Sequence, residues 1–597
     1  MCKLHNLQQL DLSHNSIEDD MHPCWGKMPS LKILKLSKNQ FQGDLSSIFG
    51  NQSMIEYIDV SHNHFQGVVP FSIFTNFSKL HHLDLSYNNG LDVETESPTW
   101  LPSFQLQHLF LAGCNLNQRS GHNIPSFIST QYTLQTLDLS HNSIPGLIPT
   151  WMLYNVSSVL RLRGNSFVGK FPQFYPNKAS LLVELDISSN QFNGPLPSNI
   201  SGLLPKLYAF NVSSNGFTGT IPISLGELPN LQHLDLSNNN FIGEIPSGLT
   251  ENSPLWYLNL SNNSLHGDLL PRDSNMTQLR WLLLHHNSFS GSMPSCLSNS
   301  PFLEMLDVRV NFLSGTISSL RVFPHLAAFL LRGNNFAGNI PRQLCQMQKI
   351  QFLDLSMNSF SGNIPSCFKD NLFWKKKSQA DSWVPTGFTT KGNPYNFQGI
   401  PLTLMTGIDL SSNQLTGAIA IEIGELQDLH SLNLSHNLLS GHFPTSFQYL
   451  TNLESLDLSH NKLTGKIPSE IVQLNFLSFF SVAFNDLSGM IPFKEQLSTF
   501  TESSYIGNPN LCGQPLERKC PGSVEMGVDK KEEKHMEKKG NIDEPLIFYA
   551  FVAMSYALGF WSVIIPLFFS KNWRIKYFTA IDGFINFCFE KYDAYFA

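Results

Sequence analysis

The sequence has few charged residues and no long run of positive ones. Lys, Arg, Asp and Glu make up 14% of its 597 residues, whereas about 25% is usual for soluble domains. The formal net charge is −8, and no basic stripe is present that would neutralise a phosphate backbone, so we expect no nucleic-acid partner. The hydrophobic content of 42% is ordinary, which excludes both a disordered chain and a polytopic membrane protein.

Motifs of catalysis and of cofactor binding are also missing. The sequence has no Walker loop, no H-E-x-x-H, no G-x-S-x-G and no C-x-x-C pair. The histidine pairs at 81–82 and 285–286 are adjacent, so on a strand the two rings of each pair face opposite ways. We therefore expect no metal site and no cofactor. The last residues, 570–597, are too few for a kinase domain, and the sequence predicts a protein that binds rather than an enzyme.

One short pattern, in contrast, recurs along most of the chain. It has the form L-x-x-L-x-L-x-x-N/C-x-L, as in LQQLDLSHNSI (7–17), LKILKLSKNQF (31–41), LQHLDLSNNNF (231–241), LHSLNLSHNLL (429–439) and LESLDLSHNKL (453–463). Its Asn returns mostly every 23 to 25 residues from Asn15 to Asn358, with Cys114 in its place once, and again from Asn413 to Asn485. This is the leucine-rich repeat, present in about 19 copies.

Each residue of the repeat has a physical role. The leucines of L-x-L point inward from a short strand and stack between neighbouring turns as one core. The Asn anchors backbone groups where the chain leaves the strand, and Cys114 offers a weaker donor there. A Phe two residues later predicts an aromatic spine of Phe41, Phe65, Phe167, Phe192, Phe217, Phe241, Phe289, Phe336 and Phe360. The expected fold is an α/β-type leucine-rich-repeat solenoid, a curved right-handed superhelix with a concave parallel sheet.

The spacing of the repeats divides the chain into segments. Between Asn358 and Asn413 lies an island without a repeat, and such insertions form loops on one face of a solenoid, often the binding face. Its Trp, Phe and Tyr residues favour that role over a tolerated disordered loop. The expected segments are repeats at 1–368 (15 turns), the island at 369–404, the last four repeats at 405–490, a C-terminal cap at 491–524, a charged stalk at 525–544, a transmembrane helix at 545–569 and a cytoplasmic tail at 570–597.

The uncharged run 545–569 determines the expected topology. As a helix it is long enough to cross a hydrocarbon core of about 30 Å. Asp543 and Glu544 precede it, whereas Lys571 and Arg574 follow it, so the positive-inside rule places the C-terminus in the cytosol and the repeats outside. We expect a single-pass type I protein of the plasma membrane.

Three cysteine pairs are candidates for disulfides, as an oxidising exterior permits. Two pairs share one spacing and one phase of the repeat, and the third lies beyond the last repeat. The candidate pairs are Cys2 with Cys24, Cys345 with Cys367, and Cys512 with Cys520. Cys296 matches the second position of such a pair, but Ser274 stands where its partner would be, so we expect a free thiol.

Asn-x-Ser/Thr sequons all precede the apolar run and are therefore candidates for glycosylation. They are Asn51, Asn76, Asn155, Asn199, Asn211, Asn259, Asn262, Asn275 and Asn433. A repeat rich in Asn and Ser also produces sequons by accident.

On the concave strands, the outward-facing positions usually carry polar residues. The candidate binding surface lies where other residues replace them. The departures are greatest near the anchors from Asn263 to Asn334, and they are mostly aromatic residues and Arg, which dominate interface energetics. Strands about 4.8 Å apart make each outward column a continuous ladder. The candidate ligand-binding residues are Trp256, Tyr257, Arg280, Trp281, His285, Arg309 and Arg332. Drift of an unused surface is the alternative explanation for any one of them.

The chain as a whole resembles the plant leucine-rich-repeat receptor-like proteins, which are cell-surface receptors without a kinase. The resemblance rests on the G-x-I-P form of the repeat and on three stretches: FTTKGNPYNFQGIPLTLMTGIDLSSNQLTG (388–417), SYIGNPNLCGQPLERKC (504–520) and KNWRIKYF (571–578). The order of island, four repeats, cap, stalk, membrane helix and short tail is also that of the family. The family's signal peptide and N-terminal cap are not visible, and AIAIE (418–422) replaces the usual I-P-x-E.

The resemblance implies a receptor that binds an extracellular peptide, protein or glycan, commonly a microbial molecule, in plant defence. It further implies signalling through leucine-rich-repeat receptor kinases as adaptor and co-receptor, with the last four repeats meeting the co-receptor. A developmental receptor subunit for an endogenous peptide is the first alternative. An inhibitor of secreted wall-degrading enzymes and a truncated product without function are the others, and the apolar run 545–569 argues against the inhibitor.

Overall fold

The computed structural model describes residues 4, 6–20, 28–47, 49, 54–96, 100, 102–172, 174–175, 178–251, 253–375, 386–397 and 404–520. Cys2, Cys24 and Asn51 lie outside the described residues, as do the expected stalk, membrane helix and tail. Within the described ranges, no helix combines the length and the apolar character that crossing a bilayer requires.

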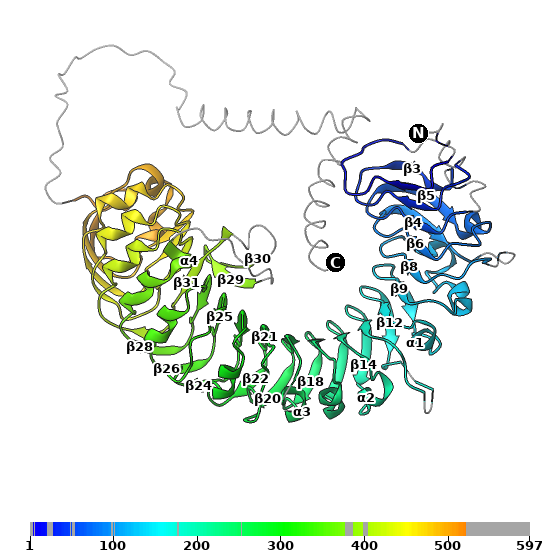
Figure 1. Ribbon diagram of the computed structural model, residues 1–597. Helices are drawn as coiled ribbons and strands as arrows, with labels where there is room; N and C mark the ends of the chain where they lie inside the picture. Colours follow the sequence, from blue (N-terminus) through cyan, green and yellow to red (C-terminus); the bar gives the residue numbers. More distant parts are fainter. Residues whose placement is uncertain are drawn as a thin grey trace, which may run out of the picture.

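The described chain forms an open arc whose inner, concave face is one long sheet (Figure 1). The sheet has 19 strands, the number of repeats expected from the anchors, and each strand is parallel to that of the next repeat. The middle residue of each strand is buried, and its two neighbours face outward. The strands are β1 (Gln9–Asp11), β2 (Ile33–Lys35), β4 (Tyr57–Asp59), β6 (His82–Asp84), β8 (His108–Phe110), β9 (Thr136–Asp138), β11 (Val159–Arg161), β13 (Glu184–Asp186), β15 (Ala209–Asn211), β17 (His233–Asp235), β19 (Tyr257–Asn259), β21 (Trp281–Leu283), β23 (Met305–Asp307), β25 (Ala328–Leu330), β27 (Phe352–Asp354), β31 (Gly407–Asp409), β33 (Ser431–Asn433), β35 (Ser455–Asp457) and β37 (Phe479–Ser481).

A second strand follows the anchor in most repeats and pairs in parallel with its counterparts. The Gly of G-x-I-P lies at or next to the end of this strand with a positive φ, 88° at Gly243, which explains the preference for glycine there. These strands are β3 (Gln42–Asp44), β5 (His64–Pro70), β7 (Gly90–Glu94), β10 (Pro145–Gly146), β12 (Ser166–Gly169), β14 (Gln191–Pro195), β16 (Gly216–Thr220), β18 (Asn240–Gly243), β20 (Ser264–Asp268), β22 (Ser288–Ser290), β24 (Ser314–Gly315), β26 (Asn335–Asn339), β28 (Ser359–Gly362), β32 (Gln414–Leu415), β34 (Ser440–His442), β36 (Lys462–Gly465), β38 (Asp486–Met490) and β39 (Asn510–Cys512).

The helical side of the repeats consists mainly of short 3₁₀ turns. Many begin directly after the Pro of G-x-I-P, and Ala420 takes the same backbone conformation in AIAIE (φ −62°, ψ 130°) as Pro222 does in its repeat. The 3₁₀ turns are η2 (Leu45–Ser47), η3 (Phe71–Phe74), η4 (Gln118–Ser120), η5 (Ser126–Thr130), η6 (Ile223–Glu227), η7 (Ser295–Asn299), η8 (Arg342–Gln346), η9 (Ser366–Asp370), η10 (Ile421–Glu425), η11 (Thr445–Tyr449), η12 (Ser469–Gln473), η13 (Glu495–Thr499) and η14 (Glu502–Ser504). Single α-helical turns replace them at α1 (Met152–Asn155), α2 (Ile200–Leu203), α3 (Ser247–Thr250) and α4 (Leu372–Lys375).

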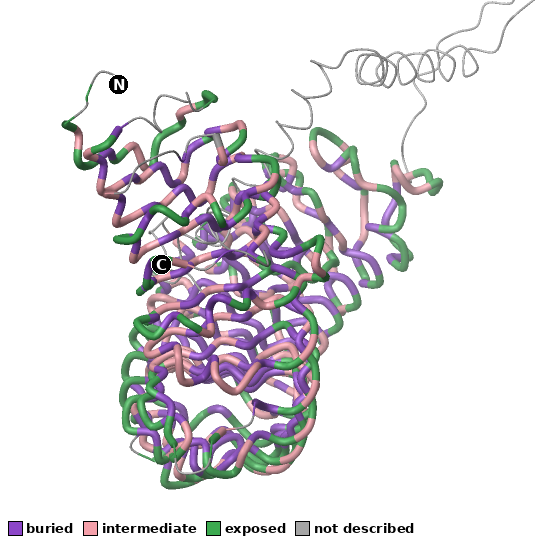
Figure 2. The backbone as a smooth tube through the Cα atoms, turned by 90° about the vertical axis from the view of Figure 1, so that its right-hand side faces the viewer, coloured by how far each residue is buried: buried purple, intermediate pink, exposed green. Residues whose placement is uncertain are grey.

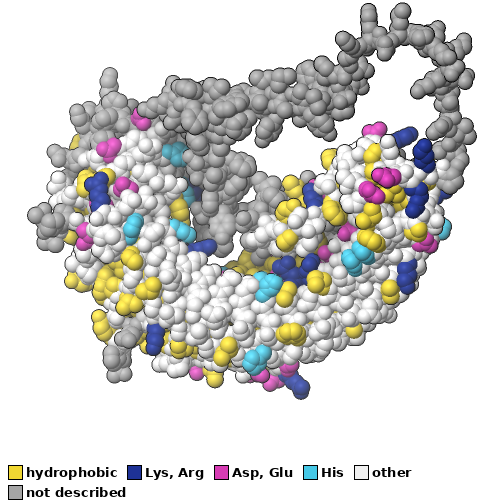
Figure 3. Space-filling view, turned by 180° about the vertical axis from the view of Figure 1, so that it is seen from behind, with side chains coloured by type: hydrophobic (Ala, Val, Ile, Leu, Met, Phe, Trp, Pro, Cys, Tyr) yellow, Lys and Arg dark blue, Asp and Glu magenta, His cyan; other side chains and the backbone are white. Residues whose placement is uncertain are grey.

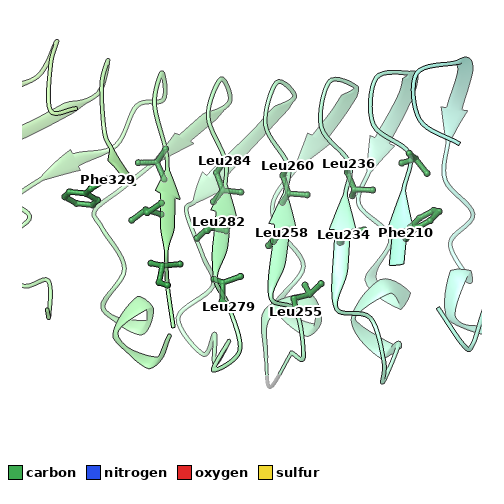
Figure 4. Close-up of a cluster of buried hydrophobic side chains, with 14 of the residues drawn as sticks. Phe210, Leu234, Leu236, Leu255, Leu258, Leu260, Leu279, Leu282, Leu284 and Phe329 are labelled. Carbon is green, nitrogen blue, oxygen red and sulfur yellow. The ribbon is translucent and has the colours of Figure 1, made fainter. Parts of the chain in front are cut away.

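The core runs without a break along the arc, and buried stretches recur in each turn (Figure 2). Leu234, Leu258 and Leu282 stack from one strand to the next (Figure 4). The predicted phenylalanine spine is confirmed, because Phe192 and Phe217 are buried with ring centroids 6.0 Å apart. Stacked rings recur at a similar spacing toward both ends, as between Phe41 and Phe65 (6.4 Å).

The anchoring Asn side chains form the expected ladder of hydrogen bonds. Nδ2 of Asn263 donates to the carbonyl of Leu236 in the preceding repeat (3.0 Å), and its Oδ1 accepts from the backbone N–H of Phe241 (3.0 Å). The thiol of Cys114 keeps only donor contacts, to the carbonyls of Leu85 (3.1 Å) and Ala112 (3.5 Å). Beyond the last predicted repeat, Asn508 makes the same contacts as an anchor.

Two of the three cysteine pairs are joined in the structure. Cys345 bonds to Cys367 between adjacent turns, and Cys512 bonds to Cys520 at the end of the solenoid. Cys296 has a free thiol, as expected from Ser274 at the partner position. The pair of Cys2 and Cys24 falls outside the described residues and stays a prediction.

The island is looped out of the solenoid without interrupting the concave sheet. Strand β27 pairs directly with β31, so that Phe352 lies opposite Gly407. The described part of the island adds α4 and an antiparallel hairpin of β29 (Thr386–Thr390) and β30 (Asn393–Phe397). The hairpin lies inside the arc, next to β31 (Figure 1), so the island contributes to the concave face.

Candidate ligand-binding face

The candidate aromatic residues come together on the concave face of β17 to β21. His233 stacks on Tyr257 with centroids 4.1 Å apart, and Trp281 meets Tyr257 and Trp256 edge-on at 5.6 and 5.4 Å. These four rings, His233, Trp256, Tyr257 and Trp281, are called the aromatic patch below. Each ring is partly exposed, so the patch presents both flat apolar surface and polar edges to a ligand.

Carboxylates hold the rings of the patch in place. The Tyr257 hydroxyl donates to Asp235 (3.1 Å), and the Trp281 indole N–H donates to Glu304 (3.0 Å). Glu304 also pairs with the exposed Arg280 (3.1 Å). Because indole and guanidinium share one carboxylate, Arg280 and Trp281 form a rigid pair at the open end of the candidate surface. From the sequence, neither His233 nor Asp235 was included in the candidate binding surface.

Arg309 is not free for a ligand, because it is already engaged by the protein itself. Its guanidinium binds both carboxylate oxygens of Asp307 (2.8 and 2.5 Å), and Nη1 donates to the carbonyl of Gly387 in the island (2.6 Å). Burial, the largest single effect, raises the pKa of Asp307, but the charges of Arg309 and His285 together with the hydrogen bonds from Arg309 outweigh it, so that pKa is lowered. His285 lies 3.8 Å from Asp307, and burial lowers the pKa of its ring.

Arg332 has a similar role one repeat further on. Its Nη1 donates to the hydroxyl of Thr389 in the island (3.1 Å) and lies 3.9 Å from the buried carboxylate of Asp409. The two arginines expected to meet a ligand therefore hold the hairpin against the concave face. In a space-filling view, Lys and Arg side chains and hydrophobic side chains lie together in the hollow of the arc (Figure 3).

The hairpin also covers an apolar strip of the concave sheet. Phe388 packs against Phe352 (5.2 Å between centroids) in a cluster with Met305 and Ala328, separate from the main core. Gly407 makes room for the ring, because a Cβ there would lie 2.4 Å from an atom of Phe388. Tyr257 and Trp281 pack against the same cluster, so the aromatic patch is the uncovered continuation of a strip that the island closes.

A cavity of about 530 Å³ lies on the other side of the hairpin. Thr390, Lys391 and Tyr395 of the island line it, together with His430 and Glu454 of the last repeats. No sequence pattern indicates this cavity, because its walls come from segments far apart in the chain. Across the described residues, no three His, Cys, Asp or Glu side chains come close enough together to hold a metal ion.

Buried carboxyls beneath the island predict a pH dependence of stability. Burial, together with the charge of Asp354, raises the pKa of Asp409 to about 7. Because the folded chain then binds this proton more tightly than the unfolded chain, the carboxyl destabilises the fold increasingly as the pH rises from its ordinary pKa of 3.8 to about 7, and the penalty disappears as the pH falls back toward 3.8. Asp409→Asn is expected to stabilise the protein by roughly 1–3 kcal/mol at pH 8 and by less at pH 5.

Urea unfolding at pH 5, 6, 7 and 8 measures this difference. Asp486→Asn, at an exposed position of β38, removes the same charge elsewhere in the solenoid and serves as the control. A gain from Asp409→Asn that is equal at pH 5 and pH 8 would contradict the assignment.

The described sequons differ in whether their amides are accessible. Asn76 and Asn199 are exposed, whereas Asn259 is buried and its Nδ2, the atom that a glycan modifies, donates to Asp235 (3.2 Å). Nδ2 of Asn433 donates to Asp409 in the same way (3.3 Å). The partly exposed sequons are Asn155, Asn211, Asn262, Asn275 and Asn433. Asn259 and Asn433 therefore lie in strands of the concave sheet with their amides engaged by carboxylates, and glycosylation of each sequon stays a prediction.

Known proteins match both the repeats and the arc. Leucine-rich-repeat family profiles match residues 3–20, 133–154, 181–203, 230–252, 278–300, 349–371 and 427–487. The fold and these matches define the class: the chain is a leucine-rich-repeat protein.

Its curated relatives are plant receptor-like proteins. Cuscuta receptor 1 of Solanum lycopersicum is 55% identical over 203 residues, which cover 34% of this chain and 18% of the relative. Receptor-like protein 1 of Arabidopsis thaliana is 56% identical over 200 residues, or 33% of this chain and 18% of that protein. These matches support a plant leucine-rich-repeat receptor-like protein, and the matched stretch makes up 18% of the length of these two relatives.

Solved structures share the arc over most of its length. The Arabidopsis receptor kinase HAESA, in complex with the peptide hormone IDA and the co-receptor SERK1, superposes with a TM-score of 0.63 at 29% identity, over 87% of this chain and 89% of that one. A TDR receptor superposes with a TM-score of 0.62 at 28% identity, over 86% and 90%. The PEPR1–AtPEP1 structure gives 0.58 at 25% identity, over 85% and 76%.

Proposed function

We propose that this protein is the ligand-binding part of a cell-surface receptor that recognises an extracellular peptide on its concave face. The solenoid lies outside the plasma membrane, the run 545–569 crosses it, and the signal passes through partner receptor kinases in plant defence. The observation that carries the proposal is the aromatic patch, since partly exposed Trp and Tyr rings fixed by carboxylates are the usual centres of interface energy. The peptide-hormone complex of HAESA and the structure of the peptide hormone receptor RGFR1 with RGF2 support a peptide as the ligand.

In this proposal, the two ends of the ligand-binding face have different functions. The aromatic patch and Arg280 form the open end that a peptide contacts first. The island, held by Arg309 and Arg332, closes the other end and gives the face its shape. The last four repeats, 413–490, lie beyond the island and are proposed to meet a co-receptor kinase, as the SERK1 complex of HAESA suggests. A developmental peptide is the second candidate ligand, because several of the structural neighbours bind peptide hormones.

Removing the centre of the patch tests the receptor function. Full chains with an added secretion signal are displayed on plant cells, and labelled peptides from microbial culture filtrates and plant extracellular fluid are screened for binding. Trp281→Ala is expected to weaken binding of a captured peptide by roughly 30-fold, the loss of about 2 kcal/mol typical of an interface hot spot.

Tyr132→Ala is the matched control, because Tyr132 is 78% exposed and lies in none of the concave strands. Its peptide binding should equal that of the unmodified chain. Unchanged binding in Trp281→Ala, at an unchanged unfolding midpoint, would contradict a ligand site on the aromatic patch.

A further inference from the structure

A second group of rings lies on the concave face toward the N-terminal end of the arc. Tyr57 stacks on His82 with ring centroids 3.9 Å apart. The rings of Phe110 and His108 lie 5.6 and 5.5 Å from that of His82. All four rings are partly exposed, and they come from three consecutive concave strands, β4, β6 and β8 (Figure 1). Tyr57, His82, His108 and Phe110 are called the N-terminal ring cluster below.

The cluster repeats the arrangement at the centre of the aromatic patch. The planes of Tyr57 and His82 are 7° apart, and those of His233 and Tyr257 are 5° apart. In both pairs each ring belongs to the first residue of its strand, and the two strands are neighbours. The two stacks therefore stand in the same outward column of one sheet. Since partly exposed tyrosines of this kind dominate interface energetics, the concave face has a second place suited to a ligand.

The histidines of the cluster carry no charge at neutral pH. Burial, together with the nearby charge of His108, lowers the pKa of His82 to about 4 despite the carboxylate of Asp59, and burial also lowers the pKa of His108. The carboxylates of Asp59 and Asp84 accept hydrogen bonds from serines of their own turns. The rings thus present neutral aromatic surface, and aromatic side chains pack against such rings with centroids about 4.5–7 Å apart.

The floor between the two ring sites carries smaller side chains in the column of the stacked rings. Thr136, Val159 and Ala209 stand there on β9, β11 and β15. Arg161 pairs with Glu184 on the neighbouring strand (2.6 Å), so each of these two charges is met within the floor. A peptide main chain can lie along such a floor and place bulky side chains at its two ends.

The strand pairing gives the length that such a peptide needs. Six steps of the sheet separate His82 on β6 from His233 on β17, which is about 29 Å at a strand spacing of about 4.8 Å. An extended chain advances about 3.3 Å per residue. A peptide that reaches both ring sites therefore has its two contact residues about nine positions apart.

We propose that the N-terminal ring cluster is a second anchor site for the peptide that binds the aromatic patch, and that it takes an aromatic side chain. The peptide lies extended along the concave face and crosses β9 to β15. Binding at one anchor holds the other close to its site, so two modest contacts combine into tight binding. The inference rests on the proposed peptide-receptor function and specifies the length of the ligand and the chemistry of one end.

Peptide selection on the full chain tests the second anchor. A phage library of random pentadecapeptides is selected on the detergent-solubilised full chain, and phage that also bind Trp281→Ala are removed, which leaves peptides that need the aromatic patch. These peptides are expected to bind Phe110→Ala and Tyr57→Ala about tenfold more weakly. Alanine at one aromatic residue of a captured peptide should weaken binding to the unmodified chain by a similar factor, but should have little further effect on Phe110→Ala.

The length of the peptide gives a test that leaves its anchor residues intact. Deleting three residues between the anchors is expected to weaken binding about tenfold or more, because the shortened chain cannot span both sites, whereas inserting two glycines should cost less. Phe476→Ala is the matched control, since Phe476 is 65% exposed and lies in none of the concave strands. It should leave binding unchanged, and melting midpoints verify that each variant is folded.

Peptides that bind Phe110→Ala and Tyr57→Ala as tightly as the unmodified chain would overturn the second anchor and leave the receptor function standing, because the selection has already shown that they need Trp281. Full binding by the shortened peptide would have the same meaning. If no phage remain after removal on Trp281→Ala, both proposals fail.

Discussion

Arg309→Ala is expected to lower the free energy of unfolding by about 3–5 kcal/mol, the cost of leaving one partner of a buried ion pair behind. Asp307, 1% exposed, would lose its bidentate cation, and its pKa would rise from the lowered value that Arg309 maintains. The same change removes the donor to Gly387, so the hairpin 386–397 should detach. Urea unfolding measures the first effect, and hydrogen exchange of the hairpin amides measures the second.

A double variant separates these two effects. In the outward column of the concave sheet, Asp307 stands between Leu283 and Leu330, so Asp307→Leu with Arg309→Met replaces the pair by apolar residues of similar size. Such replacements are often neutral or stabilising, and most of the lost stability should return while the hairpin stays detached. Arg321→Ala, at an exposed arginine, is the control. A hairpin that remains protected in Arg309→Ala would show that its other contacts, those of Phe388, Arg332 and Lys391, suffice to hold the island.

Asn142→Ala is expected to lower the free energy of unfolding by a similar amount, about 3–5 kcal/mol, because several buried backbone groups lose their hydrogen-bond partner at once. Asn142 is 2% exposed; it donates to the carbonyls of Leu111 and Leu139 (2.7 and 3.0 Å) and accepts from the backbone N–H groups of Cys114 and Leu116 (3.1 and 3.2 Å). Alanine fills none of these roles.

Unfolding of Asn142→Ala is compared with that of Asn335→Ala, where the Asn is exposed on β26 and lies outside the ladder. The control should change stability by less than about 0.5 kcal/mol. Equal effects of the two substitutions would mean that the ladder contributes little beyond the leucine core.

The repeat makes most of the fold predictable from the spacing of its residues. Anchors from Asn15 to Asn485 correspond one to one with the 19 concave strands, because each anchor, leucine and glycine acts within its own turn or the next. Asn508 was not recognised as an anchor, because the residues before it do not follow the leucine pattern of the repeat. Its side chain nevertheless makes the anchor contacts. The aromatic patch was predictable for the same reason, as Tyr257 and Trp281 are one repeat apart.

The island was predictable as an insertion but not in its contacts. Arg309 and Arg332 are predicted from the sequence to bind a ligand, whereas the structure places them against Gly387 and Thr389. The sequence held one sign of the contact with the island, because Gly407 interrupts a column of larger outward residues and leaves space for Phe388. Only the structure shows that the ring of Phe388 fills that space.

The sequence by itself determined the solenoid, the number of its turns, the phenylalanine spine and the position of the aromatic patch. These features repeat with the chain, so local spacing specifies them. The tertiary structure alone decided that the hairpin folds back over β23 to β27, that two arginines hold it, and that a cavity lies behind it. Those contacts join residues as far apart as Arg309 and Gly387, 78 positions along the chain, and no periodic pattern links residues that meet only once.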